Sequence, residues 1–103
     1  MLEIIAAYII DGDTFAVGAQ RYRLWGIDAP EIQTRQGRRA QRILRSLMDS
    51  EPWFCYPKAQ DKYGRSVVQC INAQGADLAC TLIDQGAARD WPRFSGGYYA
   101  SCD

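Results

Sequence analysis

Acidic residues gather at two points in the first third of the sequence. Asp11 and Asp13 flank a glycine directly after an apolar run, and the segment GIDAPE adds Asp28 and Glu31. A D-G dipeptide between apolar runs usually marks a turn, so the first pair alone predicts no more than a turn. Carboxylates at strand ends are also the hard oxygen ligands that Ca²⁺ or Mg²⁺ takes. Together, the two segments raise the hypothesis of a metal site.

Two arginines extend this hypothesis toward phosphate chemistry. Arg23 lies on the same expected strand as Asp28, and Arg65 closes the segment DKYGR. Near a carboxylate-bound cation, two guanidinium groups can clamp a phosphate and stabilise the charge that builds up when it is attacked. The sequence has no histidine, which excludes a histidine general base and a His-ligated zinc site. Glu31 is therefore the best candidate to align an attacking water.

The chain must bend sharply for the two acidic segments to meet. A hairpin turn at residues 18–19 would place Asp13 opposite Leu24. Asp28 would then lie four residues further along, roughly 13 Å away at the usual strand rise. A bulge or bend at Gly26 could close that gap.

Periodicity predicts the elements that carry these residues. Apolar runs at residues 3–10, 13–17 and 21–27 indicate a meander of three strands. Residues 37–48 switch to helical spacing and carry arginines on the other side. The apolar positions of this helix are Ala40, Ile43, Leu44 and Leu47, and the arginines are Arg38, Arg42 and Arg45.

The second half of the chain is expected to start with a hairpin of residues 52–56 and 66–70. If the numbers of paired residues sum to 125, Cys55 lies opposite Cys70, within the separation that a disulfide needs. A second helix is expected over residues 77–86, with an acidic N-cap and a glycine stop. The tail that follows is aromatic and irregular.

These elements favour an α+β, mainly β, fold in a single domain of residues 1–103. Five short strands with a helix between them suggest a small OB-type barrel, because that arrangement buries one face and leaves few free edges. An open α+β sandwich is the alternative, which periodicity does not exclude. With 103 residues, 48% of them hydrophobic, the chain is long enough for one core.

Four cysteines, at positions 55, 70, 80 and 102, have no CxxC spacing, so a zinc site is poorly supported. An even count in a small chain favours two disulfides and an oxidising compartment, and four reduced, buried cysteines are the alternative. No signal peptide and no membrane-length apolar run is visible. If a leader has been removed, we expect a secreted or periplasmic protein; the sequence does not decide the location.

The charge balance argues against a global attraction for polyanions. Twelve basic and twelve acidic residues give a formal net charge of zero, so any affinity for nucleic acid must come from local arrangement. One local candidate is the arginine series at positions 35, 38, 39, 42 and 45. It could contact backbone phosphates or could simply be a solvated helix face.

In order and spacing, the segments DGDT, RLWGIDAPE, DKYGR and DLACTLIDQGAA resemble the staphylococcal nuclease (thermonuclease) family. The resemblance covers residues 8–99, and its three-part signature is specific. It implies a Ca²⁺-dependent endonuclease that hydrolyses DNA or RNA with little sequence specificity. The expected cleavage is at the bond to the 5′ oxygen and leaves 3′-phosphate ends. We also expect a monomer with no membrane partner.

The resemblance implies roles for individual residues. The expected metal ligands are Asp13, Asp28 and the backbone carbonyl of Ala29, and the expected catalytic residues are Arg23, Glu31 and Arg65. Lys62 and Tyr63 match residues near the terminal phosphate of the nucleotide, and Asp11 and Thr14 match residues that orient the Ca²⁺ carboxylates. Separately, Trp91, Phe94 and Tyr63 could stack bases; for Trp91 and Phe94 the alternative is packing in the core.

The sequence departs from the family in three respects. The first is its formal net charge of zero, which contrasts with the basic surface expected of a nuclease that binds long polyanions tightly. The loop after Glu31 is short, and the chain ends soon after the point where the family commonly continues into a third helix, so that helix is expected to be missing or shortened. A bridge from Cys80 to Cys102 could anchor the tail. The alternative functions are a non-catalytic OB-type nucleic-acid-binding module and a disulfide-stabilised interaction domain. Retention of all the matched acids and arginines favours the enzyme.

Overall fold

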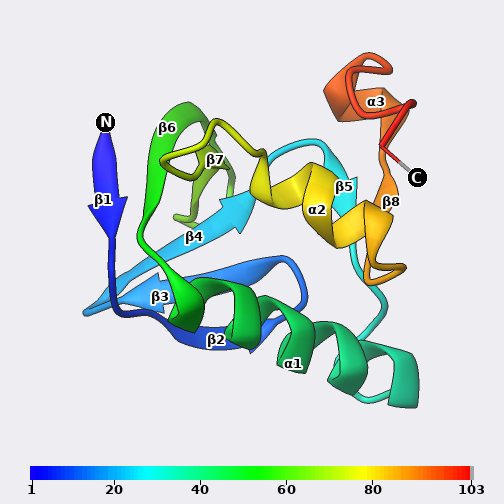
Figure 1. Cartoon of the computed structure of the whole chain (residues 1–103), viewed down its shortest axis with the longest axis horizontal. Coiled ribbons are helices and arrows are strands. Elements are labelled where there is room, and N and C mark those ends of the chain that lie inside the picture. Colours follow the sequence, from blue (N-terminus) through cyan, green and yellow to red (C-terminus); the bar gives the residue numbers. More distant parts are fainter. Residues whose placement is uncertain (103) are drawn as a thin grey trace.

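A curled, six-stranded sheet forms the body of the protein in a computed structural model that describes residues 1–102. In chain order the elements are β1 (Leu2–Ile4), β2 (Tyr8–Asp11), β3 (Thr14–Val17), β4 (Gln20–Leu24), β5 (Ile27–Asp28), α1 (Arg35–Ser50), β6 (Trp53–Gln60), β7 (Ser66–Ile71), α2 (Leu78–Asp84), β8 (Arg89–Asp90) and α3 (Pro92–Ser95). Figure 1 shows α1 running alongside β2 and β3, and α2 placed between β7 and the β5–β8 region.

The strand order of the large sheet is β1-β6-β7-β4-β3-β2, and β5 and β8 form a separate two-stranded ribbon. Only the β4–β7 pair is parallel among these described strands. The sheet curls into a half-barrel, so the expected α+β, mainly β, OB-like architecture is confirmed.

Three details differ from the sequence-based prediction. The expected strand of residues 21–27 is interrupted because the chain bends at Gly26, so Arg23 lies on β4 and Asp28 lies on β5, in separate sheets. The apolar run at residues 3–10 forms two strands, because the chain bends after Ile4; β1 then pairs with β6, whereas β2 pairs with β3. This bend lets one run serve two edges of a curled sheet, which consequently has six strands instead of five. The tail is also less irregular than expected, since it contains β8 and the four-residue helix α3, which ends at Gly96 with φ of 64°.

The strand registers agree with the prediction at both hairpins. Thr14 pairs with Arg23, and the Leu24 N–H donates to the Asp13 carbonyl at 2.9 Å, so Asp13 does lie opposite Leu24. Cys55 pairs with Cys70, which is the register that sums to 125, before a bulge after Pro57 shifts the pairing.

Each long helix is capped by a side chain and packs one face on the core. The Thr34 hydroxyl accepts a bond from the Gly37 N–H at the start of α1, and Asp77 accepts one from the Cys80 N–H at the start of α2. Such caps satisfy backbone donors that a helix start leaves unpaired. The largest buried side chains are Trp53, Tyr99, Phe15, Leu24, Ile27, Leu44, Leu78 and Leu82.

All four cysteines are in disulfides. Cys55 and Cys70 are joined across β6 and β7, and both are buried. Cys80 on α2 is joined to Cys102 in the tail, with 5.1 Å between their Cα atoms. Both pairings considered from the sequence are therefore present. Within residues 1–102, none of the helices combines the length and apolar character that crossing a membrane requires.

Candidate active site

The turn between β2 and β3 packs closely on its neighbours through Gly12. A Cβ atom added at Gly12 would lie 2.6 Å from the Ala40 Cβ on α1 and 2.9 Å from the Ala29 Cβ. The Asp13 N–H donates to the Asp11 carboxylate at 3.1 Å, which closes the turn. Gly12 is thus required for its small size, and it brings the acidic turn against the loop that carries Ala29.

Asp13 is a buried carboxylate. Its side chain accepts hydrogen bonds from the Thr14 hydroxyl at 3.0 Å and from the Ala29 N–H at 2.9 Å. Burial, together with the neighbouring Asp11, raises the pKa of Asp13 to about 6, although Arg23 and the Ala29 N–H act in the opposite direction. A bound cation would stabilise this carboxylate in its ionised form.

Arg23 joins the two acidic segments. Its Nη2 atom lies 3.4 Å from Asp13 Oδ2 and 3.8 Å from Asp28 Oδ1. Its Nη1 atom donates to the carbonyls of Leu24 at 2.8 Å and Ile27 at 3.1 Å. The two carboxylates therefore meet at one guanidinium nitrogen.

The bend that brings Asp28 back toward Asp13 is at Gly26. Its φ of +79° is in the left-handed region, where residues with a side chain are strained. The turn closes the distance that a straight strand would leave between the two acids, as the sequence suggested for this position.

Asp28 has a second cationic partner that the sequence did not reveal. Asp28 pairs with Arg89 across the β5–β8 ribbon, and Arg89 Nη2 lies 3.2 Å from Asp28 Oδ2. Opposite charges on facing strand positions are a recognisable signal. The signal could not be used here because β8 has only two residues and no strand pattern.

Glu31 lies in an exposed loop that is seated on the first turn of α1. Its carbonyl accepts bonds from the Thr34 N–H at 3.0 Å and the Thr34 hydroxyl at 2.7 Å. A Cβ atom at Gly37 would come within 1.7 Å of the Glu31 carbonyl oxygen, so only glycine allows this contact. Among the described residues, the Glu31 carboxylate has neither a hydrogen-bond nor an ion-pair partner.

Arg65 is positioned by Asp61, another residue that the sequence reasoning missed. Arg65 Nε lies 2.5 Å from Asp61 Oδ2, and the N–H groups of Arg65 and Tyr63 both donate to Asp61 Oδ1 at 2.9 Å. Slight burial raises the pKa of Asp61, but these hydrogen bonds outweigh it and the pKa is lowered. The i,i+4 spacing within DKYGR was the available signal.

A groove of about 550 Å³ brings the two arginines and most of the expected substrate residues together. Arg23, from β4, and Arg65, directly before β7, share this groove with aromatic and basic side chains of the β6–β7 turn and the tail. Its lining includes Arg23, Trp25, Lys62, Tyr63, Arg65, Trp91 and Phe94.

Trp91 and Phe94 face this groove and are outside the hydrophobic core. The Trp91 N–H donates to the Gly26 carbonyl at 2.8 Å, which ties the tail to the bend beside the acids. The Arg23 guanidinium carbon lies 5.4 Å from the Trp91 ring centroid, and the Phe94 ring lies edge-on to Trp91 at 4.5 Å. Of the two readings of these aromatics, core packing is thereby excluded.

The donor set at this site suits a hard divalent cation only with help from backbone oxygen or solvent. Within residues 1–102, the acidic and cysteine side chains form no group of three that could hold a metal by themselves. The available donors are the carboxylates of Asp13 and Asp28 and the adjoining backbone of Ala29. Oxygen ligands supplemented by water are the pattern of Ca²⁺ sites, so these residues fit Ca²⁺.

The chain is similar to one known family and to several known proteins. The family model described as "Staphylococcal nuclease homologue" matches residues 21–98. The chain is 34% identical to the "Succinoglycan biosynthesis protein ExoI" of Rhizobium meliloti (strain 1021), over 92% of this chain and 56% of that protein. It is 32% identical to an "Uncharacterized endonuclease" of Escherichia coli O157:H7, over 78% of this chain and 55% of that protein. The chain thus spans about half the length of these relatives.

Proposed function

Because this chain belongs to the staphylococcal nuclease family, we propose that it is an endonuclease that hydrolyses phosphodiester bonds of DNA or RNA with little sequence specificity. The observation that carries the proposal is the meeting of the Asp13 and Asp28 carboxylates at Arg23, beside a groove that Arg65 also lines. A similar protein of Escherichia coli is named as an endonuclease. A non-catalytic binding module would have no need for this cluster of acids and arginines.

In this proposal the two arginines bind the scissile phosphate. A phosphodiester carries a negative charge that repels an incoming hydroxide, and this charge increases in the transition state. Arg65 is held by Asp61 at one position of the groove, while Arg23 is held by two carbonyls at another. Guanidinium groups held in advance lose little freedom when the phosphate arrives, which favours catalysis.

Asp13, Asp28 and the carbonyl of Ala29 would hold Ca²⁺, with Asp11 and Thr14 orienting the carboxylates. When bound, the cation would supply positive charge to the phosphate oxygens. Without a cation, burial raises the pKa of Asp13 to about 6, and a bound cation would favour the ionised carboxylate. Asp13 itself contributes position and charge, and no proton transfer is assigned to it.

Glu31 is assigned to the attacking water. Its exposed side chain follows the Asp28 strand and is free of partners among the described residues, so it can accept a proton from water or align the water for in-line attack. Attack on phosphorus with cleavage of the bond to the 5′ oxygen leaves a 3′-phosphate on one product and a 5′-hydroxyl on the other.

The test is digestion of single-stranded DNA, double-stranded DNA and RNA with Ca²⁺ and then with a chelator. We expect Ca²⁺-dependent cleavage, and Glu31→Gln should lower its rate by about 10²–10⁴-fold because a general base is lost. The melting temperature of the variant should stay unchanged, since Glu31 is exposed. Glu3→Gln, at an exposed position on β1, is the matched control and should cleave normally.

Two outcomes would overturn this assignment. Near-full activity of Glu31→Gln would remove Glu31 from the mechanism. Binding of nucleic acid without cleavage under any metal would replace the enzyme by the non-catalytic OB-type module.

The surroundings of the enzyme are also part of the proposal. Two disulfides in a chain of 103 residues support an oxidising compartment, so we propose a secreted or periplasmic protein. We propose that it acts as a monomer on nucleic acid, without a membrane partner. A thiol titration of protein isolated under denaturing, non-reducing conditions would test the first point, and finding four free thiols would contradict it.

A further inference from the structure

Trp25 lines the groove but has no part in the chemistry proposed above. It follows Arg23 by two residues, at the point where β4 turns toward β5. The backbone N–H of Trp25 donates to the Val68 carbonyl at 2.8 Å. The indole is partly buried, with its inner side against the core and another part in the groove wall. A large aromatic ring is thus presented next to the phosphate-binding arginines.

Two tyrosines of the tail support this ring from behind and beside it. The centroids of Tyr98 and Tyr99 each lie 5.6 Å from that of Trp25, and the two tyrosine rings are 5.0 Å apart. Tyr99 is buried, whereas Tyr98 is 61% exposed. These three residues form what we name the aromatic cluster. It has one fixed ring, one ring in the groove wall and one ring open to solvent.

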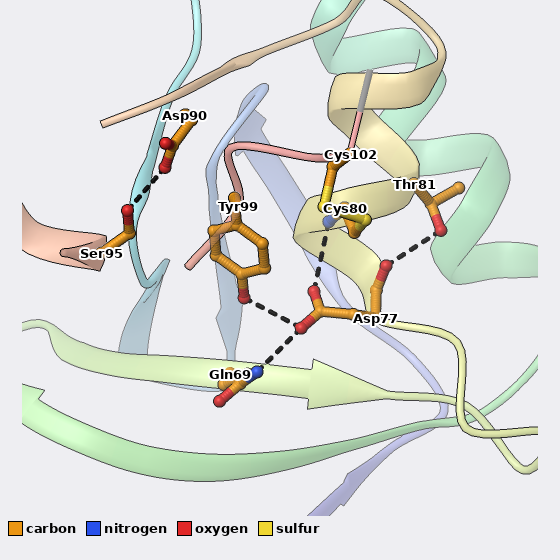
Figure 2. Close-up of a disulfide and its surroundings, with 8 residues drawn as sticks. All are labelled: Gln69, Asp77, Cys80, Thr81, Asp90, Ser95, Tyr99 and Cys102. Atoms are coloured by element: carbon orange, nitrogen blue, oxygen red, sulfur yellow. Dashed lines mark hydrogen bonds between the residues drawn. A yellow bond between two sulfur atoms is a disulfide. The ribbon is translucent and has the colours of Figure 1, made fainter. Parts of the chain in front are cut away.

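The tail is fixed at several points, which keeps the aromatic cluster in place. Figure 2 shows Tyr99 donating to Asp77, which also accepts a bond from Gln69 and caps the helix that carries Cys80. The disulfide from Cys80 to Cys102 closes the tail three residues after Tyr99.

Gly26 provides a further contact for the tail. A Cβ atom there would lie 2.9 Å from the Tyr99 ring, so only glycine allows this approach. The position of the Tyr99 ring is therefore set before any ligand binds, and the tail that carries Tyr98 is anchored next to it.

Cations accompany the aromatic rings around the groove. Lys58 Nζ lies 4.7 Å from the Trp25 centroid, Lys62 Nζ lies 5.3 Å from the Tyr63 centroid, and the Arg23 guanidinium lies over Trp91. The acidic residue in the groove lining, Asp61, is already paired with Arg65. Aromatic faces for bases alternating with cations for phosphates are the features of a single-strand nucleic-acid site.

We propose that Trp25, with Tyr98 beside it and Lys58 over it, is a second base-stacking subsite, which takes the nucleobase next to the nucleotide held at Arg23 and Arg65. The base stacks on the indole, and the Lys58 ammonium moves from the ring to the phosphate that follows. This inference rests on the proposed nuclease function and assigns its substrate class as single-stranded DNA or RNA of at least two nucleotides. In a duplex the bases are stacked internally and cannot reach Trp25.

Binding, measured without cleavage, tests this subsite. In the Glu31→Gln background with Ca²⁺, the affinity for thymidine 3′,5′-bisphosphate is compared with that for the corresponding dinucleotide and tetranucleotide by calorimetry. The second base should increase affinity by about 5-fold or more, the lower range for one stacked base. Trp25→Leu should abolish this increase while leaving the mononucleotide affinity unchanged, and Trp25→Phe should retain most of it.

Two further variants keep the test decisive if Trp25→Leu fails to fold. Tyr98→Ala changes a mostly exposed ring and should reduce the increase between one and two bases. Replacing Cys80 and Cys102 by serine should reduce it as well, because the tail then loses its covalent anchor. Tyr8→Ala, an exposed aromatic on β2 outside the groove, is the matched control and should change nothing.

The subsite is overturned if the dinucleotide binds no better than the mononucleotide, or if the increase survives both Trp25→Leu and Tyr98→Ala. Equal losses for both ligands would also overturn it, because Trp25 would then support the whole groove. These results are distinct from failure of the nuclease proposal, which is scored by cleavage in the wild-type protein.

Discussion

Arg23 and Trp25 are two residues apart in the chain, yet they belong to regions that are built in opposite ways. Arg23 lies in a carboxylate cluster, which we define as Asp11, Asp13, Arg23 and Asp28 and which hydrogen bonds and ion pairs hold together. Trp25 lies in the aromatic cluster, which ring packing and a disulfide-anchored tail hold in place.

The difference teaches how each region should respond to change. Hydrogen bonds and ion pairs depend on the orientation and the chemical type of the groups that form them. Substitutions in the carboxylate cluster should therefore reduce activity even when they preserve the shape of the side chain. Aromatic packing depends on volume and on the order of the tail, so the aromatic cluster should respond to loss of bulk or of the cross-link. Catalysis and recognition should therefore be separable by mutation.

The largest effect is expected from Arg23→Lys, which preserves charge and alters geometry. Lysine cannot bond to the Leu24 and Ile27 carbonyls and face both carboxylates at once, as the arginine does. The cleavage rate should fall by about 10²–10³-fold, the usual cost of losing one transition-state donor. Arg21→Lys, at an exposed position on the same strand, is the control for steady-state kinetics. Similar rates for both variants would contradict this account of the carboxylate cluster.

Replacing Cys80 and Cys102 by serine should have a smaller effect on cleavage and should mainly reduce the stability of the protein. The bridge closes a loop with a sequence separation of 22 residues, and its removal should lower the free energy of unfolding by about 3 kcal/mol. Urea denaturation at equilibrium measures this loss. The cleavage rate at saturating substrate should change only a few-fold at a temperature where the variant is folded. A rate loss as large as that of Arg23→Lys would show that the two regions are not separable.

The Asp13 carboxylate should lower the free energy of unfolding of the metal-free protein by an amount that depends on pH. Without metal, the pKa of Asp13 is raised to about 6, so between pH 4 and pH 6 the folded state binds more protons than the unfolded state. Stability must then fall as pH rises through this window. With a chelator present, Asp13→Asn should be about 1–3 kcal/mol more stable than wild type at pH 7 and should lose this advantage near pH 4.

Thermal unfolding at both pH values, with Ca²⁺ omitted, measures the penalty at Asp13. The same variant should be inactive as a nuclease. Asp49→Asn, at an exposed position on α1, is the control and should keep the wild-type pH dependence because Asp13 is unchanged. If Asp13→Asn is less stable than wild type at pH 7, the Asp13 carboxylate stabilises the folded protein and the prediction is wrong.

The smallest effect is expected outside both regions, on the arginines of α1. Arg42 and Arg45 are exposed on the helix that begins beside the Glu31 loop. If they contact backbone phosphates, replacing both by glutamine should weaken binding of single-stranded DNA a few-fold and should reduce the slope of log affinity against log salt by about 1.4. An unchanged slope would identify them as a solvated helix face. The comparison with Arg21→Gln controls for the general loss of charge.

Much of the fold was predictable because its signals are local. The hairpin registers followed from alternation and turn position, and the structure places Asp13 opposite Leu24 and Cys55 opposite Cys70 accordingly. The segments that contain Asp13, Arg23 and Asp28 are sufficient to identify these residues as candidates for the site. Their roles in catalysis remain predictions that the mutants above must test.

Other features could not be read from the sequence because distant segments create them. The bend that divides residues 3–10 into β1 and β2 serves two partner strands that are far apart in the chain. Arg89 is a partner of Asp28 only because a two-residue strand pairs with β5. Gly12 and Gly37 have no unusual φ and are required only because another segment lies against them.

The sequence by itself determined the chemistry that this protein can attempt. It contains carboxylates, arginines and no histidine, in segments whose order is that of one nuclease family. Only the tertiary structure decided that two carboxylates meet at one arginine and that Trp25 joins the groove with two tail tyrosines behind it. The physical reason is that residue types and local periodicity are properties of short segments, whereas convergence depends on how a curled sheet and a cross-linked tail pack together.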